Sequence, residues 1–166
     1  MQLEPLLMRE VLASFPTGVT AVAALVDGEA RGLAVNSFTS VSLEPPMVLI
    51  CVGRSSGTWP ELARAPMLGI SVLAAHQGRA CRQLSGPRDH RFAGLDWRAT
   101  PDGAVLLSGA RAWLECSPER QWPAGDHDIV LLRAHSLWDD RAETPLVFYG
   151  SRLRRLEELE EAEQAS

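Results

Sequence analysis

The chain has 166 residues, the size of one domain, and a formal net charge of −5. A negative charge argues against a nucleic-acid partner, because a protein that neutralises phosphates needs a basic face. All 16 basic residues are arginines, which excludes chemistry that needs a lysine amine, such as Schiff-base formation.

The two ends of the chain carry different signals. Charged residues such as Glu4 and Arg9 are interleaved with the apolar residues of the first 15 positions, so we expect no signal peptide. No apolar run approaches the roughly 20 residues of a membrane-spanning helix. We therefore expect a cytoplasmic protein without a membrane partner. Acidic residues dominate positions 157–166, which we interpret as a tail after one domain at positions 1–156.

Hydrophobic periodicity predicts a helix over Glu4–Ser14, followed by strands over Thr17–Val26 and Arg31–Val41. Asp27-Gly28 between these strands is typical of a hairpin turn, and Pro45-Pro46 ends the second strand.

The same patterns continue to the end of the chain. They predict helices over Ser55–Arg64 and Ala74–Leu84, and a polar helix or frayed tail over Leu153–Glu163. They predict strands over Met47–Val52, Met67–Leu73, Val105–Leu107, Ala112–Cys116, Ile129–His135 and Leu146–Tyr149. Seven or eight short strands that do not alternate with helices favour a mainly β fold, an antiparallel barrel with peripheral helices.

The sequence lacks the common signatures of metal and nucleophile chemistry. Cys51, Cys81 and Cys116 are widely spaced and form no CxxC pair, so we expect no structural metal. Cys51 lies in the apolar run Val48–Val52 and is expected to be a small buried hydrophobe. There is no GxGxxG, GxSxG or P-loop motif. An enzyme with this sequence would therefore rely on a cofactor for its reactive group.

Three polar segments are candidates for a cofactor site. The segment 36–42 carries an amide and several hydroxyls that suit a heteroaromatic ring, although a self-capping Ser/Thr turn explains them as well. The segment 54–58 has a guanidinium and hydroxyls before a predicted helix, which suits a phosphate group or a simple helix cap. The segment 88–92 adds cations and an aromatic ring, and alone it is typical of a surface loop.

Six motifs, in this order and spacing, resemble those of the flavin reductase family from Phe15 to about Leu156. They are FPTGVT at 15–20, NSFTSVSLEPP at 36–46, RSSGTW at 54–59, FAG at 92–94, GDHDIVL at 125–131 and PLVFYGSRLRRL at 145–156. The resemblance implies an antiparallel Greek-key split β-barrel, the FMN-binding split barrel, that forms a homodimer. It also implies that NADH or NADPH reduces FMN or FAD, and that the reduced flavin goes to a partner monooxygenase.

The resemblance also implies a role for individual residues. The flavin ring and ribityl chain would lie against Asn36, Ser37, Phe38, Thr39 and Ser40. The flavin phosphate would lie against Arg54, Ser55, Ser56 and Thr58, and the phosphate or adenine side against Arg91 and Phe92. The nicotinamide would meet His127, the catalytic candidate, and the turn formed by Tyr149, Gly150, Ser151 and Arg152. Val52 and Asp126 complete the cofactor-binding set.

Two positions depart from the family pattern and keep other hypotheses open. Ser151 occupies a position where the family commonly has glycine, and Leu153 occupies one where the family has an aromatic residue. Both departures affect the contacts with the nicotinamide dinucleotide more than those with the flavin. A flavin carrier or sensor without turnover is therefore a second hypothesis. A third is a split barrel that binds another ring cofactor such as haem, with an axial ligand among His76, His90, His127 and His135.

Overall fold

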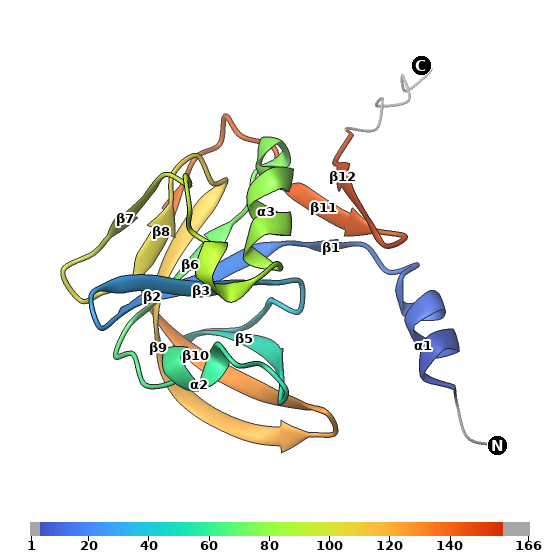
Figure 1. The fold of residues 1–166 in the computed structure, drawn as a ribbon, viewed down its shortest axis with the longest axis horizontal. Coiled ribbons are helices and arrows are strands. Elements are labelled where there is room, and N and C mark those ends of the chain that lie inside the picture. Colours follow the sequence, from blue (N-terminus) through green and yellow to red (C-terminus); the bar gives the residue numbers. More distant parts are fainter. Residues whose placement is uncertain (1–3, 158–166) are drawn as a thin grey trace, which may run out of the picture.

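The structure is a computed structural model, and it describes residues 4–157 (Figure 1). The helices are α1 (Pro5–Leu12), α2 (Trp59–Leu62) and α3 (Gly78–Leu84), with single 3-10 turns η1 (Ala75–Gln77) and η2 (Arg88–His90). The strands are β1 (Thr17–Gly18), β2 (Thr20–Val26), β3 (Glu29–Val35), β4 (Thr39–Leu43), β5 (Pro46–Gly53), β6 (Leu68–Val72), β7 (Trp97–Ala99), β8 (Val105–Leu107), β9 (Ala112–Ala124), β10 (His127–Asp139), β11 (Leu146–Tyr149) and β12 (Arg152–Arg155).

This inventory confirms the mainly β class, but the predicted number of strands was too low. Twelve strands lie within residues 4–157, and the short β7 was not predicted at all. No helix in this part of the chain is both long enough and apolar enough to cross a membrane.

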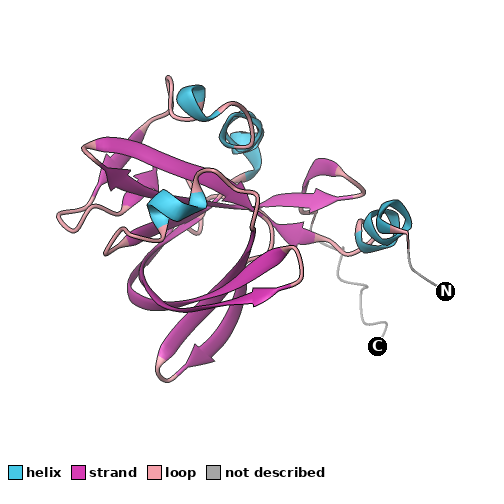
Figure 2. Cartoon of the chain, turned by 60° about the horizontal axis from the view of Figure 1, so that its bottom comes forward, coloured by secondary structure: helices cyan, strands magenta, loops and turns pink. Residues whose placement is uncertain are grey.

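A seven-stranded antiparallel sheet forms the body of the molecule, in the order β3-β2-β6-β9-β10-β5-β4. Its strands curve around a common interior (Figure 2). On β5, alternation places one face inside, because Val48, Ile50 and Val52 are buried while the residues between them are partly exposed. Leu62 and Trp59 of α2 belong to the same core cluster.

The predicted strand Arg31–Val41 is wrong as a single element, because it divides into β3 and β4. β3 pairs with β2, whereas β4 pairs with β5 at the opposite edge of the sheet. The polar segment 36–38 carries the chain between the two edges. Ser37 secures this crossing, since its hydroxyl accepts from the Cys51 N–H and donates to the Cys51 carbonyl, both at 2.8 Å. Cys51 is half-buried rather than fully buried as expected.

β9 and β10 form a hairpin much longer than the predicted strands Ala112–Cys116 and Ile129–His135. The pairing of β9 with β6 ends at Cys116, so the rest of β9 has one free edge. A free edge tolerates proline because no ladder hydrogen bond is lost there, which explains Pro118 and Pro123 within a strand. The hairpin extends beyond the body of the sheet and carries His127 at its tip (Figure 1).

A separate small sheet of β1, β11 and β12 stands beside the body, with α1 next to it (Figure 1). The predicted helix over Leu153–Glu163 is wrong where the structure describes it, because Arg152–Arg155 is β12. The residues from 158 onward lie outside the described part. Gly150 and Ser151 have φ values of 58° and 59°, so the chain makes a tight hairpin turn there. The predicted helix over Ser55–Arg64 shortens to α2.

Candidate functional site

The loop 54–58, which joins β5 to α2, has unused backbone donors. Within the described residues, the N–H groups of Ser55, Gly57 and Thr58 donate to no protein acceptor. The space beside Gly57 is open, because a Cβ placed there would meet no atom within 4 Å. Successive free N–H groups in a turn form an anion-binding concavity. The geometry therefore fits the phosphate site predicted for this loop.

Internal hydrogen bonds hold the loop in this shape. The Arg54 N–H donates to the Asp126 carbonyl at 3.0 Å, and the Ser56 N–H donates to the Gly53 carbonyl at 2.9 Å. The Ser56 hydroxyl accepts from the Trp59 N–H at 3.2 Å, whereas Thr58, the N-cap residue of α2, makes no side-chain cap hydrogen bond.

The tip of the β9–β10 hairpin brings His127 beside this loop. A Cβ placed on Gly53 would lie 3.9 Å from His127 Nε2 and 3.8 Å from Ser55 Oγ. His127 Nδ1 donates to Asp126 Oδ1 at 2.8 Å. This hydrogen bond holds the pKa of the Asp126 carboxyl below its ordinary value. With Nδ1 donating to Asp126, Nε2 is the nitrogen left to face a ligand.

Arg54 is the exposed cation of the loop, and a chain of side chains orients it. Its Nε lies 3.7 Å from Asp128 Oδ1, and 59% of its side chain is exposed. Asp128 Oδ2 accepts from Gln121 Nε2 at 2.7 Å, and Gln121 Oε1 accepts from the indole of Trp59 at 3.1 Å. The guanidinium is thus accessible to a ligand phosphate.

Arg91 and Thr58 lie together on the other side of the loop. The buried Thr58 hydroxyl accepts from Arg91 Nη1 at 3.1 Å. Arg91 also donates to the carbonyls of Gly32 and Gly86, each at 2.9 Å. Burial and the nearby Arg88 lower the pKa of Arg91. Through these hydrogen bonds, Arg91 connects β3 to the loop 54–58.

Phe92 packs on β3 rather than standing free. Its Cζ would lie 2.9 Å from a Cβ added to Gly32, so only glycine allows the ring this close. The ring meets Trp97 edge to face, with centroids 6.3 Å apart. Phe92 therefore fixes the course of the segment that carries Arg91.

A cavity of about 570 Å³ is lined by residues of the β2–β3 hairpin and of α2 together with Arg88, and a cavity of about 470 Å³ opens at the other end of β3. The second one is lined by Arg9, Leu12, Ala13, Phe15, Thr17, Asn36, Phe148 and Ser151. A neighbouring hollow of about 230 Å³ shares Asn36 and Phe148 with it. The two larger cavities fall within the range of about 300–1,000 Å³ that is typical of small-molecule sites.

Phe148 was missed by the sequence analysis. It pairs with Thr17 across β1 and β11, so its ring lies at the small sheet next to Asn36. The motif PLVFYG contained two adjacent aromatic residues, and strand alternation would have placed only one of them on this face. The other, Tyr149, lines a separate hollow of about 380 Å³ with Arg154 and Arg155.

The remaining predicted residues lie around these cavities without lining them. Ser37 is engaged with Cys51, Phe38 packs against the core, and Val52 is buried. Thr39 and Ser40 are exposed on the edge strand β4. Gly150 forms the β11–β12 turn next to the exposed Arg152.

The four histidines are dispersed. His76 lies 3.2 Å from Glu143, and His135, eight positions after His127 on β10, hydrogen-bonds Ser117 at 2.8 Å. The described residues contain no group of three or more His, Cys, Asp or Glu side chains that could hold a metal ion.

Comparisons with known proteins all find similarity to flavin reductases. The model of the family described as "flavin reductase like domain" matches residues 12–157. The reductase subunit HsaB of a flavin-dependent monooxygenase from Rhodococcus jostii is 37% identical, covering 93% of this chain and 80% of the relative. An NADH-dependent FAD reductase from Streptomyces globisporus is 40% identical over 89% of this chain and 84% of the relative.

Solved structures share the fold. The Streptomyces globisporus NADH:FAD oxidoreductase SgcE6, in complex with NAD and FAD fragments, has a TM-score of 0.86 and 38% identity. That match covers 100% of this chain and 99% of the solved one. BorF, the flavin reductase component of a bacterial two-component tryptophan halogenase, has a TM-score of 0.85 at 33% identity, with 94% and 100% of the two chains covered.

Proposed function

Since the chain belongs to the flavin reductase-like family, we propose that it is an NAD(P)H:flavin oxidoreductase that reduces FMN or FAD for a partner monooxygenase. The observation that carries this proposal is the open loop 54–58, with three free N–H groups and an exposed arginine beside His127. A phosphate site beside a hydrogen-bonding imidazole suits the phosphate of a flavin and the amide of a nicotinamide.

The flavin phosphate would lie in the loop, held by Arg54 and by the N–H groups of Ser55, Gly57 and Thr58. Ser56, Thr58 and Arg91 use their side chains within the protein, so in this proposal they shape the loop rather than bind. The ring would lie toward Asn36, whose exposed amide lines the cavity with Phe148. Ser37 would fix that segment through Cys51.

A bound flavin would supply the hydride acceptor, and a bound nicotinamide would supply the hydride. The protein's part is to hold the two rings in contact, and this orientation supplies the entropic share of catalysis. No side-chain acid or base is needed for the hydride. His127, oriented by Asp126, would donate or accept a hydrogen bond at the nicotinamide amide through Nε2.

The turn that carries Ser151 would form the wall on the nicotinamide side. Ser151 lines the same cavity as Asn36 and Phe148, so the departure from glycine lies at the site itself. Leu153 instead packs against a buried cluster that includes Leu73 and Leu146, and it approaches Gly78. Ser151 is thus the departure that affects cofactor contacts directly.

The proposal also includes the oligomeric state of the protein and its location in the cell. A homodimer is supported by α1, which has no buried residue in the single chain. The chain would act in the cytoplasm, together with the monooxygenase that receives the reduced flavin.

The test is NADH and NADPH oxidation by the purified protein with added FMN or FAD, followed by the loss of nicotinamide absorbance. We expect rapid oxidation that depends on added flavin. Absence of oxidation with both flavins and both nicotinamides would refute the reductase. Flavin retained through desalting in that case would identify a carrier instead.

A further inference from the structure

Arg88 contacts the loop 54–58 on a carbonyl, and the function proposed above gives this arginine no role. Its Nη1 donates to the Gly57 carbonyl at 3.4 Å. That carbonyl belongs to the peptide unit that carries the Thr58 N–H, one of the free donors of the loop. In a trans peptide the C=O and N–H bonds point in opposite directions. An arginine on the carbonyl side therefore directs this N–H away from itself, toward the phosphate that the loop would bind.

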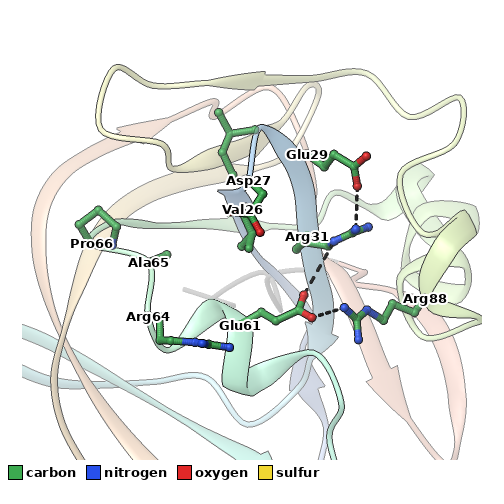
Figure 3. Close-up of a pocket in the computed structure, with 10 residues that line it drawn as sticks. Val26, Asp27, Glu29, Arg31, Glu61, Arg64, Ala65, Pro66 and Arg88 are labelled. Atoms are coloured by element: carbon green, nitrogen blue, oxygen red, sulfur yellow. Dashed lines mark hydrogen bonds and ion pairs between the residues drawn. The ribbon is translucent and has the colours of Figure 1, made fainter.

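Glu61 determines where the Arg88 guanidinium lies. The hydrogen bond to Gly57 is long, so its effect on the loop depends on how firmly the guanidinium is placed. Arg88 Nη2 pairs with Glu61 Oε1, and the two side chains point toward each other from η2 and α2 (Figure 3). The Arg88 side chain is 41% exposed. Without the carboxylate, this long side chain would have many solvated conformations in place of one.

The Glu61 carboxylate is itself fixed by a second cation. Its Oε2 is buried and has no hydrogen-bond partner among residues 4–157, but Arg31 Nε of β3 lies 3.8 Å away. Arg31 is paired in turn with Glu29 at 2.6 Å. The backbone N–H of Glu61 donates to the Thr58 carbonyl at 3.1 Å. Glu61 thus contacts the end of the loop directly through its main chain and indirectly through its side chain.

These four side chains form an alternating series of charges along the wall of the cavity of about 570 Å³ (Figure 3). The series runs from β3 through α2 and η2 to the loop, in the order Glu29, Arg31, Glu61 and Arg88. Partly exposed ion pairs contribute little to the free energy of unfolding. Because this series ends on a carbonyl of the loop, its loss should affect a ligand in the loop more than the stability of the fold.

We propose that Glu61, acting through Arg88, is a positioning residue for the flavin phosphate, an inference that rests on the proposed reductase function. Glu61 would touch no ligand. It would keep the Thr58 N–H oriented before the phosphate arrives, so that binding does not have to order this part of the loop. Glu61 should therefore matter for FMN and not for riboflavin, which has the same ring and ribityl chain but no phosphate.

The test compares the Kd values for FMN and riboflavin, measured by quenching of flavin fluorescence. Glu61→Gln keeps the size of the side chain and removes the charge that places Arg88. We expect it to raise the Kd for FMN about fivefold, within the range of measured couplings between neighbouring residues, and to leave the Kd for riboflavin unchanged. Glu119→Gln is the matched control, because Glu119 pairs with Arg133 at 2.8 Å on the β9–β10 hairpin. It should change neither Kd.

A double variant tests whether Glu61 acts through Arg88. Arg88→Ala should also raise the Kd for FMN alone, and adding Glu61→Gln to it should have no further effect, because both changes remove the same interaction. Additive effects of the two changes, an equal rise of both Kd values in Glu61→Gln, or an unchanged Kd for FMN would each overturn the inference.

Measurements on the unaltered protein separate this inference from the proposed function. Wild-type protein that binds riboflavin as tightly as FMN would refute the phosphate site and the positioning role together. If the wild-type protein oxidises NADH with FMN while Glu61→Gln keeps the wild-type Kd, only the positioning role fails. Failure of NADH oxidation with every flavin would instead refute the reductase.

Discussion

The hydrogen bond between His127 and Asp126 leads to a prediction about catalysis. His127→Ala should lower kcat/KM for NADH roughly tenfold, about the effect of one lost hydrogen bond to the nicotinamide, and leave the Kd for flavin unchanged. Asp126→Asn keeps the shape but weakens the orientation of the ring, so its effect should be smaller. Steady-state NADH oxidation at saturating flavin measures both. A His127→Ala protein with wild-type kcat/KM would show that the imidazole has no part in the reaction.

Cys116 leads to a prediction about alkaline stability. Burial, followed by the charge of Glu115, raises its pKa to about 12 from the ordinary value of 9.0. The folded protein holds this proton more tightly than the unfolded chain, so the free energy of unfolding should fall as pH rises from about 9 toward 12. Urea unfolding at several pH values measures that slope. Cys116→Ala should be less stable at neutral pH but show a shallower decline, and an identical slope would contradict the assignment.

Single residues also show where sequence reasoning succeeds. Asp27 and Gly28 have φ values of 52° and 80°, so the hairpin turn predicted from this dipeptide is confirmed. Such local signals depend on backbone sterics alone. The role of Ser37 depends instead on Cys51, fourteen positions away, and no local pattern contains that information.

At the scale of elements, the sequence-based predictions of strands were wrong where a strand has no second neighbouring strand in its sheet. The outer part of β9 is exposed on its free edge, so it shows no clear alternation and contains two prolines. β12 consists largely of arginines and was taken for a polar helix because only its pairing with β11 makes it a strand. Buried strands such as β5 and β8 were predicted well, because burial imposes an apolar pattern on the sequence.

The β11–β12 turn leads to a prediction at the same scale. Ser151 has a φ of 59°, a conformation that costs an L-residue about 1 kcal/mol or more. Ser151→Gly relieves this cost but raises the entropy of the unfolded chain, so the net gain should be about 0.5 kcal/mol. Chemical denaturation measures it. Ser151→Val should destabilise the protein, and a stable valine variant would show that the turn changes shape.

At the scale of the molecule, the fold gathers segments that are far apart in sequence. The crossing from β3 to β4 places Asn36 at one end of β3, while the long hairpin returns His127 to the loop after β5. Strand composition predicted the barrel class, but it contained no information on which strand ends meet. The motif order supplied that information through the family resemblance. Phe148 was still not predicted as a site residue, because the family resemblance implied a role only for the turn that follows it.

The apolar surface of α1 leads to the last prediction, the homodimer. Leu7 is 52% exposed and Val11 is 62% exposed, and an eight-residue helix without burial is not stable by itself in water. A second copy would cover this surface and hold the helix against the cavity of about 470 Å³ that Leu12 lines with Asn36 and Phe148. Light scattering should therefore give twice the chain mass, and Leu7→Glu with Val11→Glu should give monomers of lower activity. Arg141→Glu, a charge change on an exposed loop, should leave the dimer intact. A wild-type monomer with full activity would mean that the site is complete within one chain.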